Sequence, residues 1–202
     1  MIAFISLLFI LLPAEHSQIV VSHNAEPVVT INTLITGDGD PTCECKMQNN
    51  FPVPKDNGKT LFYIQRTPNH NTIMYDINLE NGVVDSDEPV RAYWIRYGEE
   101  GQTEDLSYIQ EHYAYGLKSR KVNDRKYELR FVSYKKLPFY LDRSTRDNQY
   151  RILATVNGKA IEVKRVFLQI EGGSFWLPNV VCAEVKGVDP VTGAEITQTF
   201  KP

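Results

Sequence analysis

Arginines interleaved with aromatic residues are the feature of this sequence most suited to chemistry. Four of them fall within stretches typical of β-strands: Arg66, Arg96, Arg130 and Arg165. A guanidinium group can hold a carboxylate or a phosphate through two parallel hydrogen bonds. A concave sheet that gathered these side chains would therefore form an anion site. For the four as a set we favour a solvated face with cross-strand ion pairs, which are routine in sheets. The acidic partners would be Asp76, Glu128 and Glu162.

Tyrosine and tryptophan accompany two of these arginines. Both side chains are stiff and amphipathic, which makes them frequent in binding sites. Arg66 and Arg96 lie within three positions of such residues. We therefore predict a non-catalytic binding or interaction domain, whose partner is an unknown small molecule, glycan or protein. The predicted ligand-binding residues are Tyr63, Arg66, Trp94, Arg96, Tyr97, Tyr115 and Trp176.

Catalytic and metal-binding patterns are weak. Gly172-Gly173-Ser174-Phe175-Trp176 lacks the second glycine of a hydrolase nucleophile elbow. Gly37 to Asp40 lacks the third acidic position and the bidentate Glu of a calcium loop. A metal site would need His70, His112 and a carboxylate such as Asp76 to meet in space. We expect no cofactor and no metal. The alternative function is a hydrolase-type enzyme whose site is assembled from scattered Tyr, Arg, Asp and His residues.

The chain has three cysteines, too few for a disulfide scaffold of the small secreted type. Cys43 and Cys45 cannot complete a tetrahedral metal site, because no second Cys or His pair occurs. Cys182 lies in an apolar run and is predicted to be a buried, unreactive thiol. The other two cysteines are expected to be exposed. Whether Cys43 or Cys45 pairs with Cys182 stays open.

The amino terminus, residues 1–22, is predicted to be a signal peptide. Ile2 to Leu12 is apolar except for Ser6, and Pro13 ends the run. About 20 residues are needed to cross a bilayer, so this run suits the apolar region of a secretory signal, although no Lys or Arg precedes it. A buried strand or helix is the alternative. We expect an exported protein, periplasmic or extracellular, that does not span a membrane.

Residues 23–58 and 59–202 form the remaining two regions. The first is dense in Pro, Gly and other turn formers, and is predicted to be a linker. The second is predicted to be one β-rich globular domain, which suits a chain of 202 residues. The chain carries 22 Lys and Arg against 25 Asp and Glu, a net charge of -3. Without a basic excess, a nucleic-acid partner is not expected.

Apolar residues alternate with polar ones along most of the domain, which is typical of half-buried strands. Asn157-Gly158 is a strong signal for a two-residue hairpin. We predict a mainly β fold, an antiparallel sandwich or barrel of eight to nine short strands with one amphipathic helix. The predicted strands are Leu61 to Arg66, Thr72 to Leu79, Arg91 to Tyr97, Lys126 to Tyr134, Phe139 to Leu141, Tyr150 to Val156, Ile161 to Ile170, Val180 to Lys186 and Glu195 to Phe200.

The helix is predicted over Thr103 to Leu117. Thr103 would be the N-cap, and the negative charges of the two acidic residues after it would interact favourably with the helix dipole. Leu106, Ile109 and Tyr113 have helical spacing, and Gly116 stands where a C-cap glycine is common. This helix would pack on the sheet or plug one end of it.

Four short stretches are shared with a known family. They are Leu61 to Asp76, Tyr93 to Tyr97, Ala114 to Gly116 and Phe175 to Asn179. On these stretches the chain resembles a bacterial family of exported proteins catalogued as domain of unknown function 4833. The resemblance covers roughly residues 60–202, which is the whole globular part. It implies a bacterial source and an uncharacterised domain, and it carries over no activity and no site.

Overall fold

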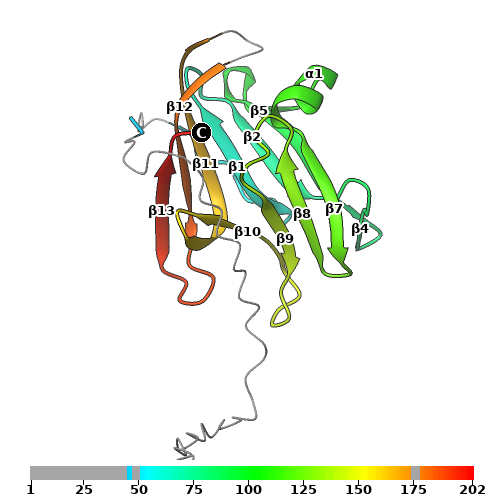
Figure 1. The fold of residues 1–202 in the computed structure, drawn as a ribbon. Helices are drawn as coiled ribbons and strands as arrows, with labels where there is room; N and C mark the ends of the chain where they lie inside the picture. Colours follow the sequence, from blue (N-terminus) through cyan, green and yellow to red (C-terminus); the bar gives the residue numbers. More distant parts are fainter. Residues whose placement is uncertain (1–44, 47–50, 174–177) are drawn as a thin grey trace, which may run out of the picture. The chain divides into compact units, whose positions relative to one another are not determined.

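The structure is a computed structural model, which describes residues 45–46, 51–173 and 178–202. The fold is mainly β, with one short helical segment between strands (Figure 1). The strands are β1 (Thr60–Arg66), β2 (Thr72–Ile77), β3 (Leu79–Glu80), β4 (Val83–Val84), β5 (Val90–Arg96), β6 (Gln102–Asp105), β7 (Leu117–Asn123), β8 (Lys126–Phe131), β9 (Phe139–Arg143), β10 (Tyr150–Val156), β11 (Lys159–Gly173), β12 (Pro178–Val188) and β13 (Glu195–Phe200). The helical turns are η1 (Tyr97–Glu99), α1 (Tyr108–Gln110) and η2 (Glu111–Tyr115).

Eleven of these strands form a single curled sheet, which is roughly consistent with the predicted antiparallel sandwich or barrel of eight to nine strands but is open and has more strands. Its order is β6-β5-β2-β1-β11-β10-β9-β8-β7, with β12 on β11 and β13 on β12. All neighbours in it are antiparallel except β1 and β11. The Asn157-Gly158 turn joins β10 to β11, and both residues have positive φ, as a type I′ hairpin requires.

The long strand β11 divides this sheet into two wings. Its first half pairs with β10 through Lys159 to Glu162, and its second half pairs with β1 through Arg165 to Leu168. Both partners lie along the edge of β11 that β12 does not occupy. Wing 1 is therefore β1, β2, β5 and β6 with the second half of β11, and wing 2 is β7, β8, β9 and β10 with its first half.

The two wings pack face to face around an apolar core. Phe62 of β1 stacks on Tyr75 of β2, with ring centroids 4.4 Å apart. Across the core, the Phe62 ring lies 5.8 Å from Phe139 and 6.3 Å from Phe131, both in wing 2. These inner-face side chains belong to one buried cluster. Alternation along each strand thus produces a packed interior between two layers, as in a sandwich.

Two edge strands, β6 and β7, were missed by the alternation argument. All four residues of β6 are exposed, and β7 carries three cationic side chains at Lys118, Arg120 and Lys121. Polar, charged edges protect a sheet from pairing with other chains. Because such strands bury little, they lack the apolar period from which strands are predicted.

The helical segment is shorter than predicted. Thr103 is not an N-cap, because it lies in β6 opposite Ile95. The N-cap is Ser107, whose side chain and Gln110 form a reciprocal capping box. Gly116 has extended backbone geometry, so it is not a left-handed C-cap. A Cβ there would lie 1.9 Å from the carbonyl oxygen of Glu111, which explains why this position requires glycine.

The outer face of wing 1 over β2 and the neighbouring parts of β1 and β11 is buried under residues 45–46 and 51–58, which we call the strap. Every residue of β2 is buried, those on the outer face included. The ring of Phe51 lies 5.3 Å from that of Phe167 on β11. The Gln65 amide donates to the carbonyl oxygen of Pro52 at 2.7 Å, and the Asn57 amide donates to Asp76 at 2.6 Å. This part of the predicted linker therefore packs on the domain.

A disulfide between Cys45 and Cys182 fastens the strap to β12. The expectation of a free Cys182 thiol is therefore wrong, although the side chain is buried as predicted. Cys43 lies outside the described residues. The bridge joins positions 137 residues apart, and β12 presents Cys182 on the outer face beside Gln169. Spacing along the sequence gives no sign of such a contact.

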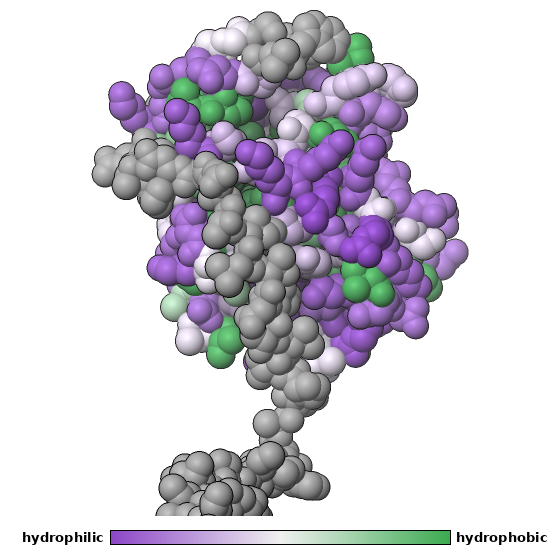
Figure 2. Space-filling view, in the orientation of Figure 1, coloured by the Kyte–Doolittle hydropathy of each residue, from purple (hydrophilic) through white to green (hydrophobic). Residues whose placement is uncertain are grey.

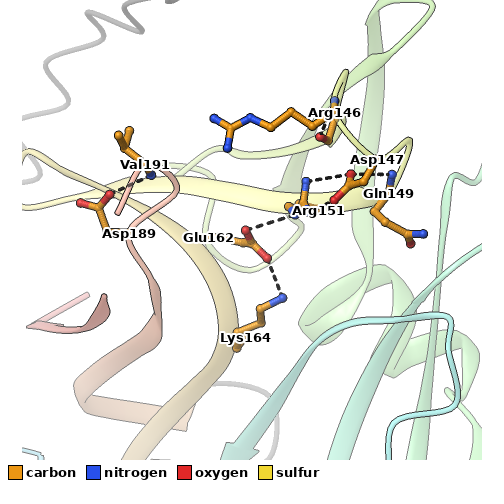
Figure 3. Close-up of polar contacts among 9 residues, drawn as sticks. Arg146, Asp147, Gln149, Arg151, Glu162, Lys164, Asp189 and Val191 are labelled. Atoms are coloured by element: carbon orange, nitrogen blue, oxygen red, sulfur yellow. Dashed lines mark hydrogen bonds and ion pairs between the residues drawn. The ribbon is translucent and has the colours of Figure 1, made fainter. Parts of the chain in front are cut away.

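The outer face of wing 2 is charged. Hydrophilic residues cover much of the surface on the side of β7 and β8 (Figure 2). On β10 and β11 a chain of ion pairs runs from Asp147 through Arg151 and Glu162 to Lys164 (Figure 3).

Among the described residues, no helix has the length and apolar character needed to cross a bilayer.

Candidate functional site

The predicted binding residues lie on two faces of wing 1. Trp94 and Arg96 on β5, Arg66 on β1 and Tyr115 on η2 come together at the inner end of the wing. Tyr63 and Tyr97 are on the outer face, and Trp176 lies outside the described residues. We call the first four the arginine–aromatic cluster. Parity along a strand explains the division, since Tyr63 is three residues from Arg66 and alternate residues point to opposite faces.

Trp94 is the centre of the cluster. Its side chain is buried, and its indole N–H donates to the Gln110 side chain at 3.2 Å. The ring of Tyr115 meets it edge-on, with centroids 5.4 Å apart. The hydroxyl of buried Tyr75 donates to the carbonyl oxygen of Tyr115 at 2.8 Å, which fixes η2 above the core. The helical segment therefore positions the cluster rather than plugging the sheet.

Two guanidinium groups lie over the Trp94 ring. Arg96 is 4.6 Å from its centroid, and Arg66 is 5.8 Å away and also 5.6 Å from the ring of Tyr115. The face of an aromatic ring attracts cations, which holds both groups in place. Burial raises the pKa of the Tyr115 hydroxyl, and the two arginines partly oppose that shift.

The two arginines differ in their polar partners. Arg96 Nε donates to the carboxylate of Glu104 at 2.7 Å. Arg66 Nε is buried and has no hydrogen-bond partner among the described residues, and no ion pair within them includes Arg66. The cluster thus contains one guanidinium that a carboxylate already satisfies and one that has no acceptor.

The other arginines of the sequence argument lie elsewhere. Arg165 is on the outer face of wing 1, where its Nε donates to Gln65 Oε1 at 2.8 Å. Arg130 is on the outer face of wing 2 and pairs with Glu128 at 2.6 Å. The four arginines therefore form no common concave surface. The favoured interpretation, ion pairs on a sheet face, holds for Glu162, which pairs with Arg151 across β10 and β11. Arg130 also pairs with the predicted partner Glu128, but within the single strand β8 rather than across strands.

The buried polar residues under the strap were not anticipated. Gln65, Thr72 and Gln169 are buried on the outer face, and Gln65 donates to Thr72 at 3.1 Å. Arg165 approaches the buried carboxylate of Glu184 to 4.0 Å. Amide side chains can serve either a wet face or a covered one, so only the position of the strap decides between them.

The groups named for a metal site, His70, His112 and Asp76, contact different residues. His70 packs against Phe51, and His112 stacks on Tyr108 with its ring nitrogen 2.9 Å from the Tyr108 carbonyl oxygen. Asp76 is occupied on the outer face by Asn57 and Tyr93. Within the described ranges, no three His, Cys, Asp or Glu side chains form a group that could hold a metal ion.

Comparison with known proteins identifies one family. The model of the family described as Domain of unknown function (DUF4833) matches residues 62–199, as the resemblance of the four short stretches predicted. No curated protein and no solved structure matches the chain. The match spans every strand of both wings, and with them the residues of the arginine–aromatic cluster.

Proposed function

Since the chain belongs to the family described as Domain of unknown function (DUF4833), its function has to be inferred from its own residues, and we propose that it is an exported binding domain. In this proposal the arginine–aromatic cluster binds the carboxylate of a small ligand, such as an acidic sugar, without turnover. The observation that carries the proposal is the buried Nε of Arg66, for which the described residues offer no hydrogen-bond acceptor.

Leaving a buried donor without an acceptor disfavours a structure by about 1–3 kcal/mol. A ligand carboxylate would remove this penalty. Arg96 supplies the precedent, because over the same tryptophan ring it holds the carboxylate of Glu104. Cation–π contacts with Trp94 and Tyr115 hold Arg66 ready, so little side-chain entropy is lost on binding.

Two observations support export. Disulfides persist in oxidising compartments and are rare in the cytosol, and Cys45 is bridged to Cys182. The apolar run from Ile2 to Leu12 suits a secretory signal. Mass spectrometry of the mature protein from its host should show that residues 1–22 are missing, and an intact Met1 would contradict export.

Trp94 fluorescence tests the binding site. The chain has two tryptophans, so a Trp176→Phe background isolates the signal of Trp94. Glucuronate and glucose serve as probes, because they differ at one carboxylate. We expect saturable quenching or enhancement with glucuronate and none with glucose.

Two variants test whether the fluorescence change on glucuronate binding depends on Arg66. Arg66→Met keeps the bulk of the side chain and removes its charge, and should weaken glucuronate binding at least about tenfold. Arg91→Met is the matched control, because Arg91 also lies over an aromatic ring, that of Tyr93, but is already paired with Asp105. Binding that survives Arg66→Met, or an Arg66→Met protein that unfolds, would overturn the proposal.

A further inference from the structure

A cationic depression lies on the outer face of wing 2, apart from the arginine–aromatic cluster. There β7, β8 and the loop after β8 line a cavity of about 230 Å³ that is open to solvent. The residues that matter for its chemistry are Lys118, Arg120, Glu128, Arg130, Phe131 and Lys135. Four of these six carry a positive charge and one a negative charge. The cavity is therefore strongly cationic in a chain whose net charge is -3.

The single carboxylate organises two of the cations. Glu128 accepts from Arg130 Nε at 2.6 Å and also pairs with Arg120. The hydrogen bond from Arg130 is the largest influence that lowers the pKa of Glu128, so this carboxyl stays ionised at neutral pH. Arg130 also donates to the carbonyl oxygen of Lys135. These bonds fix the guanidinium groups without using all of their donors.

The described part of the chain gives the two lysines no acidic partner. No ion pair within the described ranges includes Lys118 or Lys135, whereas Lys121 and Lys164 are both paired. Lys118 stands opposite Arg130 in the register of β7 and β8. One carboxylate between four cations leaves an excess of three charges, which suits a ligand group bearing two negative charges.

We propose that this cavity binds the phosphate group of a phosphate monoester. A dianionic group would meet two fixed guanidinium groups and two flexible ammonium groups, the combination that phosphate sites use. The volume is below the range of about 300–1,000 Å³ that is usual for whole small-molecule ligands. It accommodates a terminal group, while the rest of the ligand extends into solvent past the aliphatic stems of the lysines and arginines.

Titration of the full chain with three probes tests the site and identifies the source of the phosphate. The probes are inorganic phosphate, glycerol 3-phosphate and vesicles that contain phosphatidic acid, each compared with its uncharged match: buffer, glycerol and phosphatidylcholine vesicles. Binding of inorganic phosphate as tight as that of the ester indicates a free-ion site. Tighter binding of the ester indicates a soluble metabolite, and binding of vesicles alone indicates a lipid headgroup. Binding of none of the three overturns the proposal.

Lysine variants separate this site from general attraction to a basic surface. Lys118→Gln and Lys135→Gln should each weaken binding about tenfold and leave the fold intact, because neither side chain is in an ion pair. Lys126→Gln is the control, since Lys126 is on β8 and faces Tyr140 outside the cavity. Equal losses in all three variants, or no loss in the first two, would show that the cavity is not the site.

Discussion

The outer faces of the two wings differ in how much of each is covered by other parts of the chain. In wing 1 the strap covers the outer face over β2 and the neighbouring parts of β1 and β11, so Met74, Phe167 and Cys182 are as buried there as core residues. Wing 2 leaves its outer face to solvent and fills it with ion pairs between neighbouring strands, as between Arg151 and Glu162. The strands alone therefore do not determine whether a sheet face is apolar or charged. That depends on whether another segment of the chain covers the face.

The difference between the two outer faces should appear in how much substitutions on each lower the free energy of unfolding. Contacts under the strap exclude water and include a covalent bond, whereas exposed ion pairs are screened and contribute little. Substitutions at the strap should therefore destabilise the protein far more than substitutions in the ion-pair chain of wing 2.

Breaking the disulfide should have the largest effect. Cys45→Ser, made in a Cys43→Ser background so that no other thiol can pair with Cys182, removes a cross-link between residues 137 apart. We expect the free energy of unfolding to fall by about 2–5 kcal/mol, measured by urea denaturation against the Cys43→Ser parent. An unchanged midpoint would show that the strap adds nothing to wing 1.

Phe51→Ala should have the next largest effect. The Phe51 ring packs edge-on against Phe167 and His70. Because Phe51 is itself only partly buried, the loss should be about 1–3 kcal/mol, below that of a core phenylalanine. Val53→Ala is the control in the same segment: its side chain is 79% exposed, so stability should change by less than about 0.5 kcal/mol. Equal effects of the two would contradict the packing of the strap.

The Tyr93 hydroxyl gives the strap a pH dependence. Burial and the neighbouring Asp76 carboxylate raise the pKa of Tyr93 to about 12, and its hydroxyl bonds both Asp76 and Asn57 of the strap. The unfolded chain releases this proton near pH 10 while the folded protein keeps it. Stability should therefore fall as the pH rises from about 10 to 12. Tyr93→Phe should show a shallower fall over that range in pH-dependent unfolding, and equal slopes would sink this assignment.

The smallest effect should come from wing 2. Glu162→Gln removes the pairs with Arg151 at 3.3 Å and Lys164 at 2.6 Å. Since both partners are partly exposed, we expect a loss below about 1 kcal/mol, which salt at roughly 1 M should largely abolish. A loss as large as that of Phe51→Ala would remove the contrast between the two faces.

Alternation along the chain was sufficient to locate most strands of this fold. Each of the nine predicted stretches contains a strand, and the Asn157-Gly158 hairpin is present. It was not sufficient for β6 and β7, whose charged residues carry no apolar period. The predicted helix ends two residues beyond the observed segment, whose last residue is Tyr115, and begins too early, because Thr103 belongs to the edge strand β6 instead.

The sequence indicated which residues could contribute to the candidate site, but not which of them would lie together. Trp94 and Arg96, two residues apart, share a face as the strand period requires. Tyr63 and Tyr97 could have been separated from them by the same period, since each is an odd number of residues from its neighbouring arginine. The meeting of Arg66 with Tyr115 depends on the capped turn above the core, which no local pattern shows.

Local chemistry thus determined the strands, their inward faces and the turn that joins β10 to β11, because these depend on neighbours a few residues away. Only the tertiary structure decided that Cys45 bonds to Cys182, that the strap packs on wing 1, and that Arg66 Nε, unlike that of Arg96, has no acceptor among the described residues. Each of these depends on which distant segments meet across a sheet. Residues with the same side chains could equally have faced water.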